Sequence, residues 1–159
     1  MSWTNADGLT VLMHEEQGTV QTTGKTVVGI RKALVVDLED ATALVDTHSA
    51  AAGPNDAFIP ANALIVSAHF VVDTAFTSGG AATLDIGLHN AAGTAIDADG
   101  IDADIALAAL AADDAVVCDG ILVGIANVGA ADAYVNFTYE TAVFTAGSGK
   151  LVIEYIEVL

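Results

Sequence analysis

Basic side chains are scarce in this chain of 159 residues. Lys and Arg together number 4, against 21 Asp and Glu, so the formal net charge at pH 7 is -17. Proteins that bind nucleic acid or anionic lipid rely on clustered Lys and Arg to meet the negative charges of those partners. The sequence therefore predicts that neither nucleic acid nor a membrane surface is a partner.

Cysteine pairs, catalytic motifs and export signals are also missing. The single cysteine, Cys118, cannot form a disulfide within the chain, so we expect it to be a small core residue. No serine stands in the G-x-S-x-G pattern of hydrolases. The first residues do not have the pattern of a signal peptide, and the apolar runs are too short to span a bilayer. We expect a soluble protein, made without export, that is not an enzyme and needs no cofactor.

Hydrophobic residues, in contrast, make up 53% of the chain, which excludes a disordered protein. In several segments they alternate with polar residues, as in half-buried β-strands. The inward faces predicted from this alternation are Leu84, Ile86 and Leu88; Leu64, Val66, Ala68, Phe70 and Val72; and Val135, Phe137 and Tyr139. The last ten residues carry apolar side chains on both faces, so we expect that strand to be covered on both sides.

Turn-forming residues separate these segments at short intervals. Clusters of Gly, Asn, Asp and Ser occur at residues 77–80, 90–93, 97–100, 118–120, 127–132 and 146–149. Short strands between such clusters are typical of antiparallel sandwiches rather than parallel α/β folds. The predicted fold is all-β: an antiparallel β-sandwich of jelly-roll type with one short helix and an N-terminal arm or strand segment.

Four aspartates, Asp97, Asp99, Asp102 and Asp104, crowd around one glycine in "AIDADGIDADIALAAL". We interpret the first part as a solvated turn and predict a helix that starts at residue 102 or 103 and ends at residue 112, capped by aspartates and built from strong helix formers. The alternative is a weak calcium site. An EF-hand is excluded, because alanines occupy its first and twelfth ligand positions.

Two histidines also fall on polar strand faces. His69 and His89 would approach each other beside Asp85 if their strands were neighbours. Ordinary surface histidines are the simpler interpretation, because metal sites need three or four convergent ligands.

We divide the chain into three segments within a single domain. Residues 1–45 form an N-terminal arm and strands, residues 46–62 a long loop containing both prolines, and residues 63–159 the core of the sandwich. In the first segment Val28, Ile30, Leu34, Val36 and Leu38 share one face. A loop of this length is usually functional or ordered by a partner.

Two long runs carry a resemblance: "IPANALIVSAHFVVDTAFTSGGAATLDIGLHNAAGTAIDADGIDADI" and "AYVNFTYETAVFTAGSGKLVIEYIEVL". Together they cover about residues 58–159, and they resemble small virion structural proteins of tailed, especially marine, bacteriophages. The resemblance implies a capsid decoration or cementing protein, which is an oligomeric β-sandwich bound to the capsid exterior and made in the host cytoplasm. It implies the major capsid protein as a partner, with head fibres and tail components as neighbouring classes.

Two groups of residues are candidates for contacts with such partners. Lys25, Arg31 and Lys32 form an island of positive charge that would dock on a capsid, or would neutralise nearby acidic groups of the same subunit. Val152, Ile156 and Val158 form the second apolar face of the last strand, so we expect them at the interface of a homo-oligomer, a trimer by preference.

A calcium-dependent carbohydrate-binding module is the alternative from another functional class. The aspartates would hold the ion, and Trp3, Tyr134 or Tyr139 would offer a stacking surface.

Overall fold

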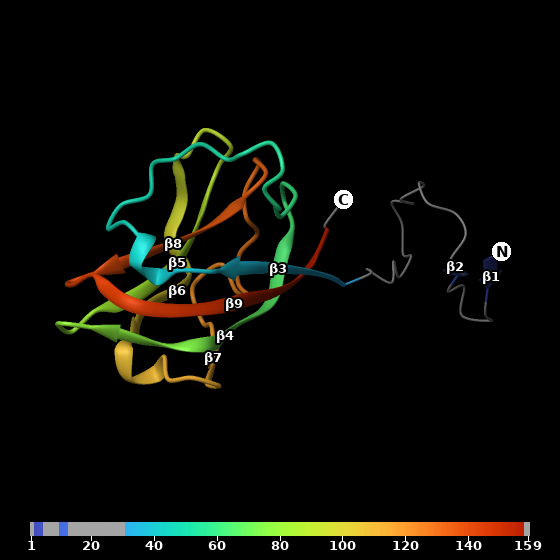
Figure 1. Cartoon of the computed structure of the whole chain (residues 1–159). Helices are drawn as coiled ribbons and strands as arrows, with labels where there is room; N and C mark the ends of the chain where they lie inside the picture. Colours follow the sequence, from blue (N-terminus) through green and yellow to red (C-terminus); the bar gives the residue numbers. More distant parts are fainter. Residues whose placement is uncertain (1, 5–9, 13–30, 158–159) are drawn as a thin grey trace. The chain divides into compact units, whose positions relative to one another are not determined.

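The computed structural model describes residues 2–4, 10–12 and 31–157 (Figure 1). The chain divides into two compact units, residues 1–30 with Leu159, and residues 31–158. In the first unit, β1 (Ser2–Thr4) pairs antiparallel with β2 (Thr10–Leu12). Val28 and Ile30 of the predicted apolar face, together with the proposed docking residue Lys25, lie outside the described residues.

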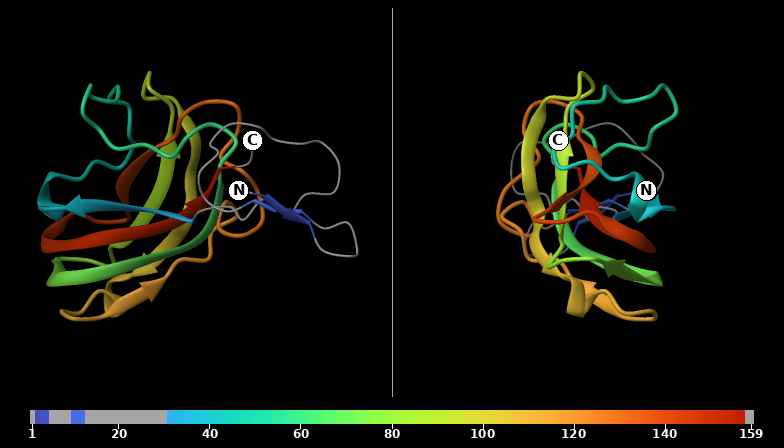
Figure 2. Two further views of the ribbon diagram at one scale, coloured as in Figure 1. Left: turned by 90° about the vertical axis from the view of Figure 1, so that its right-hand side faces the viewer. Right: turned by 60° about the vertical axis from the view of Figure 1, so that its left-hand side comes forward.

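The second unit is built from two antiparallel sheets that form two layers (Figure 2). One sheet has four strands in the order β3 (Lys32–Leu38), β9 (Phe144–Ile156), β4 (Leu64–Ser78) and β7 (Ala115–Val117). The other has three in the order β6 (Ala95–Ala106), β5 (Thr83–His89) and β8 (Tyr134–Glu140). Two 3-10 turns, η1 (Ala41–Ala43) and η2 (Leu107–Ala109), are the helical elements of the described residues.

The connections follow a jelly roll. From β4 onward, successive strands alternate between the sheets, except for the β5–β6 hairpin. A full jelly roll has two four-stranded sheets. Here an isolated parallel bridge between Val45 and Thr138 lies beside β8, where a full jelly roll has its eighth, antiparallel strand. The predicted all-β sandwich is therefore confirmed.

The space between the sheets is filled by aliphatic and aromatic side chains. Leu84, Ile86 and Leu88 of β5 are fully buried, as their alternation predicts. Phe70 of β4 lies 5.9 Å from Phe137 of β8, ring centroid to ring centroid, and thereby joins the two sheets. Full burial of the Phe70 ring contributes about 2–3 kcal/mol to folding.

No α-helix occupies residues 102–112, so that prediction is wrong. Residues up to Ala106 continue β6, and only Leu107–Ala109 form a single 3-10 turn. Ile101 and Ile105 are buried against the core, and they hold this segment on the neighbouring strand β5. Burial of these two side chains in an extended strand outweighs the helix propensity of the alanines.

Two of the predicted turns also lie inside strands. Residues 97–100 belong to β6 and residues 146–149 to β9. The glycines of β9 are needed there for another reason. A side chain at Gly147 would come within 2.5 Å of the Phe76 ring, and one at Gly149 within 2.6 Å of the Phe70 ring. These glycines therefore provide space for aromatic rings of the adjacent strand.

The predicted inward face of β4 is half right. Ala68, Phe70 and Val72 point into the core, but Leu64 and Val66 do not share their full burial. A β-bulge between Ile65 and Ser67 shifts the alternation by one residue, so that Ile65 becomes the buried side chain.

The long loop covers the outer face of the three-stranded sheet. The amide of Ala52 donates to the carbonyl of Ala91, and Ile59 bridges to Ala133. Underneath, Asn136 and Thr138 of β8 are buried although they point away from the core. The loop thus contacts the sandwich along its length, and the polar side chains beneath it are shielded from solvent.

None of the helical elements in the described ranges is long and apolar enough to cross a membrane.

We predict that Gly147→Ala destabilises the sandwich by more than about 1 kcal/mol, because φ at this position is 144° and the added methyl group meets the Phe76 ring. Gly79→Ala is the control, since φ there is ordinary and nothing lies within 4 Å of the added carbon. Chemical denaturation of both variants measures the difference. Equal denaturation midpoints for the two variants would show that the packing of Phe76 does not depend on a glycine at position 147.

Candidate binding surfaces

The aspartate-rich segment forms β6, at the edge of its sheet. Its pairing with β5 is interrupted by bulges: Asp97 faces Leu88, whereas Asp102 faces Ile86 only two residues along β5. The extra residues arch over β5, where a side chain at Gly87 would meet the carbonyl of Ala98 at 2.0 Å. Bulges and charged side chains are the features that keep an edge strand from pairing with another chain.

Two carboxylates of this region are buried. Asp85 of β5 accepts a hydrogen bond of 2.7 Å from the backbone amide of Asp104, which has a positive φ of 54°. Burial, followed by the charges of Asp104 and Asp99, raises the pKa of Asp85. Asp102 is only 6% exposed, and burial followed by the charge of Asp119 raises its pKa.

Cys118 lies in the core beside Asp102. Burial and the neighbouring carboxylate raise the pKa of its thiol to about 12. The thiol therefore stays protonated at neutral pH, and the expectation of a small core residue is confirmed.

The four aspartates of the calcium hypothesis are spread along the bulged strand. Asp102 is buried, whereas Asp99 and Asp104 are exposed. Burial and a hydrogen bond with Asp99 raise the pKa of Asp97. Across residues 31–157 and the two short N-terminal strands, no group of three or more His, Cys, Asp or Glu side chains is arranged to hold a metal ion. The calcium site at these four residues stays a prediction.

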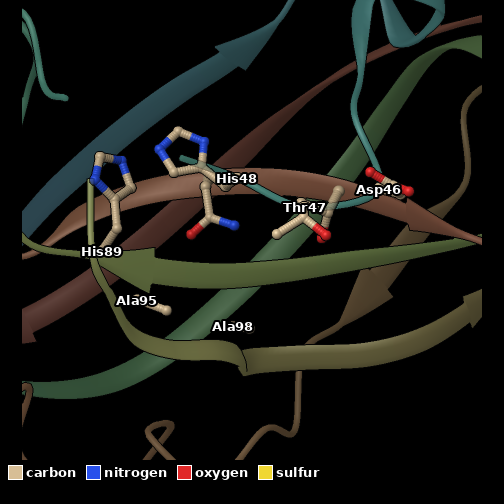
Figure 3. Close-up of a pocket in the computed structure, with 8 residues that line it drawn as sticks. Asp46, Thr47, His48, His89, Ala95 and Ala98 are labelled. Carbon is tan, nitrogen blue, oxygen red and sulfur yellow. The ribbon is translucent and has the colours of Figure 1, made fainter. Parts of the chain in front are cut away.

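The histidine pair consists of different residues from those expected. His69 is exposed on β4, in the four-stranded sheet, whereas His89 ends β5 in the other sheet. His89 instead lies against His48 of the long loop, with ring centroids 4.1 Å apart (Figure 3). Burial and the neighbouring His89 lower the pKa of His48. The sequence carries no signal for this contact, because the loop has no periodic pattern.

A small pocket of about 160 Å³ opens beside the two imidazoles. Asp46 and Thr47 line it beside the imidazoles (Figure 3). Asn136 and Thr138 are its other polar lining residues. Tyr134, one of the aromatic residues considered for carbohydrate stacking, packs against His89 and Phe58 at 5.7 and 5.8 Å between ring centroids. Its ring is thus engaged within the protein.

The two described residues of the positive island lie at one end of β3. Arg31 pairs with Glu154 at 3.2 Å, and Lys32 pairs with Glu157. The hydrogen bond to Glu157 raises the pKa of Lys32. Both pairs join β3 to the end of β9, and such exposed pairs contribute little to stability.

The expected oligomer interface lies on the outer face of the same sheet. Val152 and Ile156 are half-buried and point away from the core, whereas Leu151, Ile153 and Tyr155 point into it. The outer face of β9 is therefore only partly covered. Val158 lies outside the described residues.

Two solved structures are similar to the chain along nearly its whole length. One is described as the capsid of Ralstonia phage GP4, with a TM-score of 0.56 and 21% identity, over 90% of this chain and 94% of that one. The other is described as the capsid asymmetric unit of cyanophage Pam1, with a TM-score of 0.51 and 16% identity, over 91% of this chain and 97% of that one. At this identity the similarity establishes the fold.

No protein-family model matches the sequence, and no curated protein matches it.

We predict that Asp85→Asn and Asp102→Asn each raise the melting temperature at pH 7 by about 3 °C, the shift expected for about 1 kcal/mol in a domain of this size. A carboxylate whose native pKa is raised favours the folded state when protonated. Its contribution is therefore present near pH 4 and lost as the pH rises through the native pKa.

Both variants should lose less stability than the wild type as the pH rises from 4 to 8, because an amide does not titrate. Asp114→Asn is the control, since Asp114 is exposed and the change in net charge is the same. Calorimetry between pH 4 and 8 measures all three. If the Asp114 variant gains as much as the others, net charge rather than burial is responsible.

Proposed function

We propose that the chain is a non-enzymatic structural protein of a tailed-phage virion that decorates or cements the outer surface of the capsid. The observation that carries the proposal is the shared fold with chains from two phage capsid structures, which extends over nine-tenths or more of both partners in each comparison. A shared fold alone does not transfer function, so the proposal also draws on the chemistry of the surface.

The surface chemistry agrees with a role in contacts between proteins. Valines and isoleucines are exposed on several faces, including Val35, Val117, Ile121 and Ile125. Where such side chains lie together on one surface, as Val35 and Val117 do with Val152 on the four-stranded sheet, they favour contact with another subunit. The acidic remainder keeps densely arrayed copies soluble and limits nonspecific adhesion.

The proposed partners are further copies of this chain, as a trimer, and the major capsid protein. Val152, Ile156 and Val158 are proposed at the contact between copies, and Lys25, Arg31 and Lys32 at the contact with the capsid. Head-fibre and tail positions are the structural alternatives, and they differ from decoration chiefly in copy number.

The copy number in purified particles of the encoding virus distinguishes these positions. We expect quantitative mass spectrometry to find a number of copies close to that of the major capsid protein, and cryo-electron microscopy to place them on the capsid exterior. A few dozen copies or fewer would assign the chain to a fibre, portal or tail. Complete absence from particles would contradict the virion role.

The docking assignment has its own test. Changing Lys25, Arg31 and Lys32 together to Gln should weaken binding to undecorated capsids about tenfold at low salt, with less effect at high salt, because complementary charge acts mainly on association. Folding should be retained, since the two described ion pairs are exposed.

Lys150→Gln is the control, because it removes a cation from the middle of β9 whose partners are Asp37 and Asp73. Saturation of capsids by the triple variant at wild-type concentrations would refute docking through these residues.

A further inference from the structure

The outer face of the four-stranded sheet presents a mainly apolar row of three valines and one histidine. Val35 of β3 lies opposite Val152 of β9, Val152 lies opposite His69 of β4, and His69 lies opposite Val117 of β7. Val35 is 53% exposed and Val117 is 68% exposed. Strands are spaced about 4.8 Å apart, so this row crosses all four strands over roughly 14 Å.

The neighbouring rows extend this face on both sides. Val71 of β4 lies between Ala115 of β7 and Lys150 of β9. On its other side, Lys150 lies opposite Asp37 of β3. On the other side, Ala33 and Ser67 flank Glu154. Small and branched side chains therefore surround Lys150 and Glu154, the two charged residues of β9 on this face.

The charges on this face nearly cancel. Lys150 pairs with Asp73 and lies 3.8 Å from Asp37, and Arg31 pairs with Glu154. Every ion pair found among the described residues joins groups of β3, β9 and β4, or of the residues at their ends. On the other sheet and its loops, in contrast, the described charged residues are all carboxylates, including Asp46, Asp56, Asp97, Asp99, Asp104, Asp132 and Glu140.

We propose that this face, centred on Val35, Val152 and Val117, binds a second copy of the same chain. Two copies of a protein with a net charge of -17 repel each other over most of their surfaces. They meet with the least repulsion where each is apolar and nearly neutral. The alternation of Lys150 and Arg31 with Asp37, Asp73 and Glu154 also allows unlike charges of neighbouring copies to meet on this face.

Other occupants fit this face less well. A basic partner would find denser carboxylates on the opposite sheet. At the centre of this face an acidic partner would find Lys150, which already pairs with Asp37 and Asp73 of the same subunit. A second copy alone gains from both the apolar row and the alternating charges.

The inference deepens the homo-oligomer part of the proposed function and rests on that part alone. It places the contact at the centre of the sheet, with Val152 in the middle of the row. Copies that turn this face toward a common axis form a closed assembly. The face is then buried in every copy, so no open filament of subunits forms.

The test compares two double variants of equal net charge. Val35→Glu with Val117→Glu places two carboxylates on the face, whereas Val45→Glu with Val143→Glu places two at sites elsewhere that are 48% and 55% exposed. Light scattering after gel filtration, at tens of micromolar protein and high salt, gives the mass. We expect an oligomer for the wild type and the Val45/Val143 control, and a monomer for the Val35/Val117 variant.

A monomeric wild type would overturn the inference, as would an oligomeric Val35/Val117 variant with an unchanged mass. Circular dichroism checks that each variant folds. If the glutamates prevent folding, Val35→Thr with Val117→Thr keeps the shape and the strand propensity of valine, and should raise the dissociation constant at least tenfold. An unchanged constant would also overturn the inference.

This outcome is separate from the virion role. An oligomer that is absent from particles would leave the self-binding face intact and refute the decoration function. A monomer that still coats capsids would support the decoration function and refute the self-binding face.

Discussion

The packing of phenylalanine rings against glycines of β9 is the contact on which the sandwich depends. Phe76 and Phe70 of β4 occupy the space that side chains at Gly147 and Gly149 would fill. Phe70 also reaches Phe137 of the opposite sheet, and Phe76 meets Phe144 edge to face at 5.2 Å between centroids. These rings fix β9 between β3 and β4, and thereby fix the outward direction of Lys150, Val152 and Glu154.

The fold class could be predicted because strand alternation is a local property of the sequence. Leu84, Ile86 and Leu88 occupy the core as their spacing indicates. The wrong predictions concern segments whose conformation depends on contacts with residues far away in the sequence. Glycines at 147 and 149 have the signature of a turn until the rings beside them are known, and the alanine-rich segment after Asp102 favours a helix until Ile101 and Ile105 are seen to be buried.

The candidate surfaces were harder to predict from the sequence, because they too depend on contacts between residues far apart in the chain. The outward face of β9 could be predicted, since both sets of alternating residues in the last strand are apolar. The row that it forms with Val35 and Val117 depends on the register of strands far apart in the sequence. The contact between His48 and His89 depends on how an irregular loop folds over a sheet, for which no residue pattern exists.

The arrangement of β3 and β9 has a mechanical consequence. The strands are antiparallel neighbours, and Lys32 at the start of β3 lies opposite Tyr155 near the end of β9. Tension applied between these two points would pull perpendicular to the strands, along the direction of their hydrogen bonds, and would load one bond after another. The sandwich would open from this end like a zipper at low force. Tension applied along β3 against the body of the sheet would shear all its bonds together and meet far greater resistance.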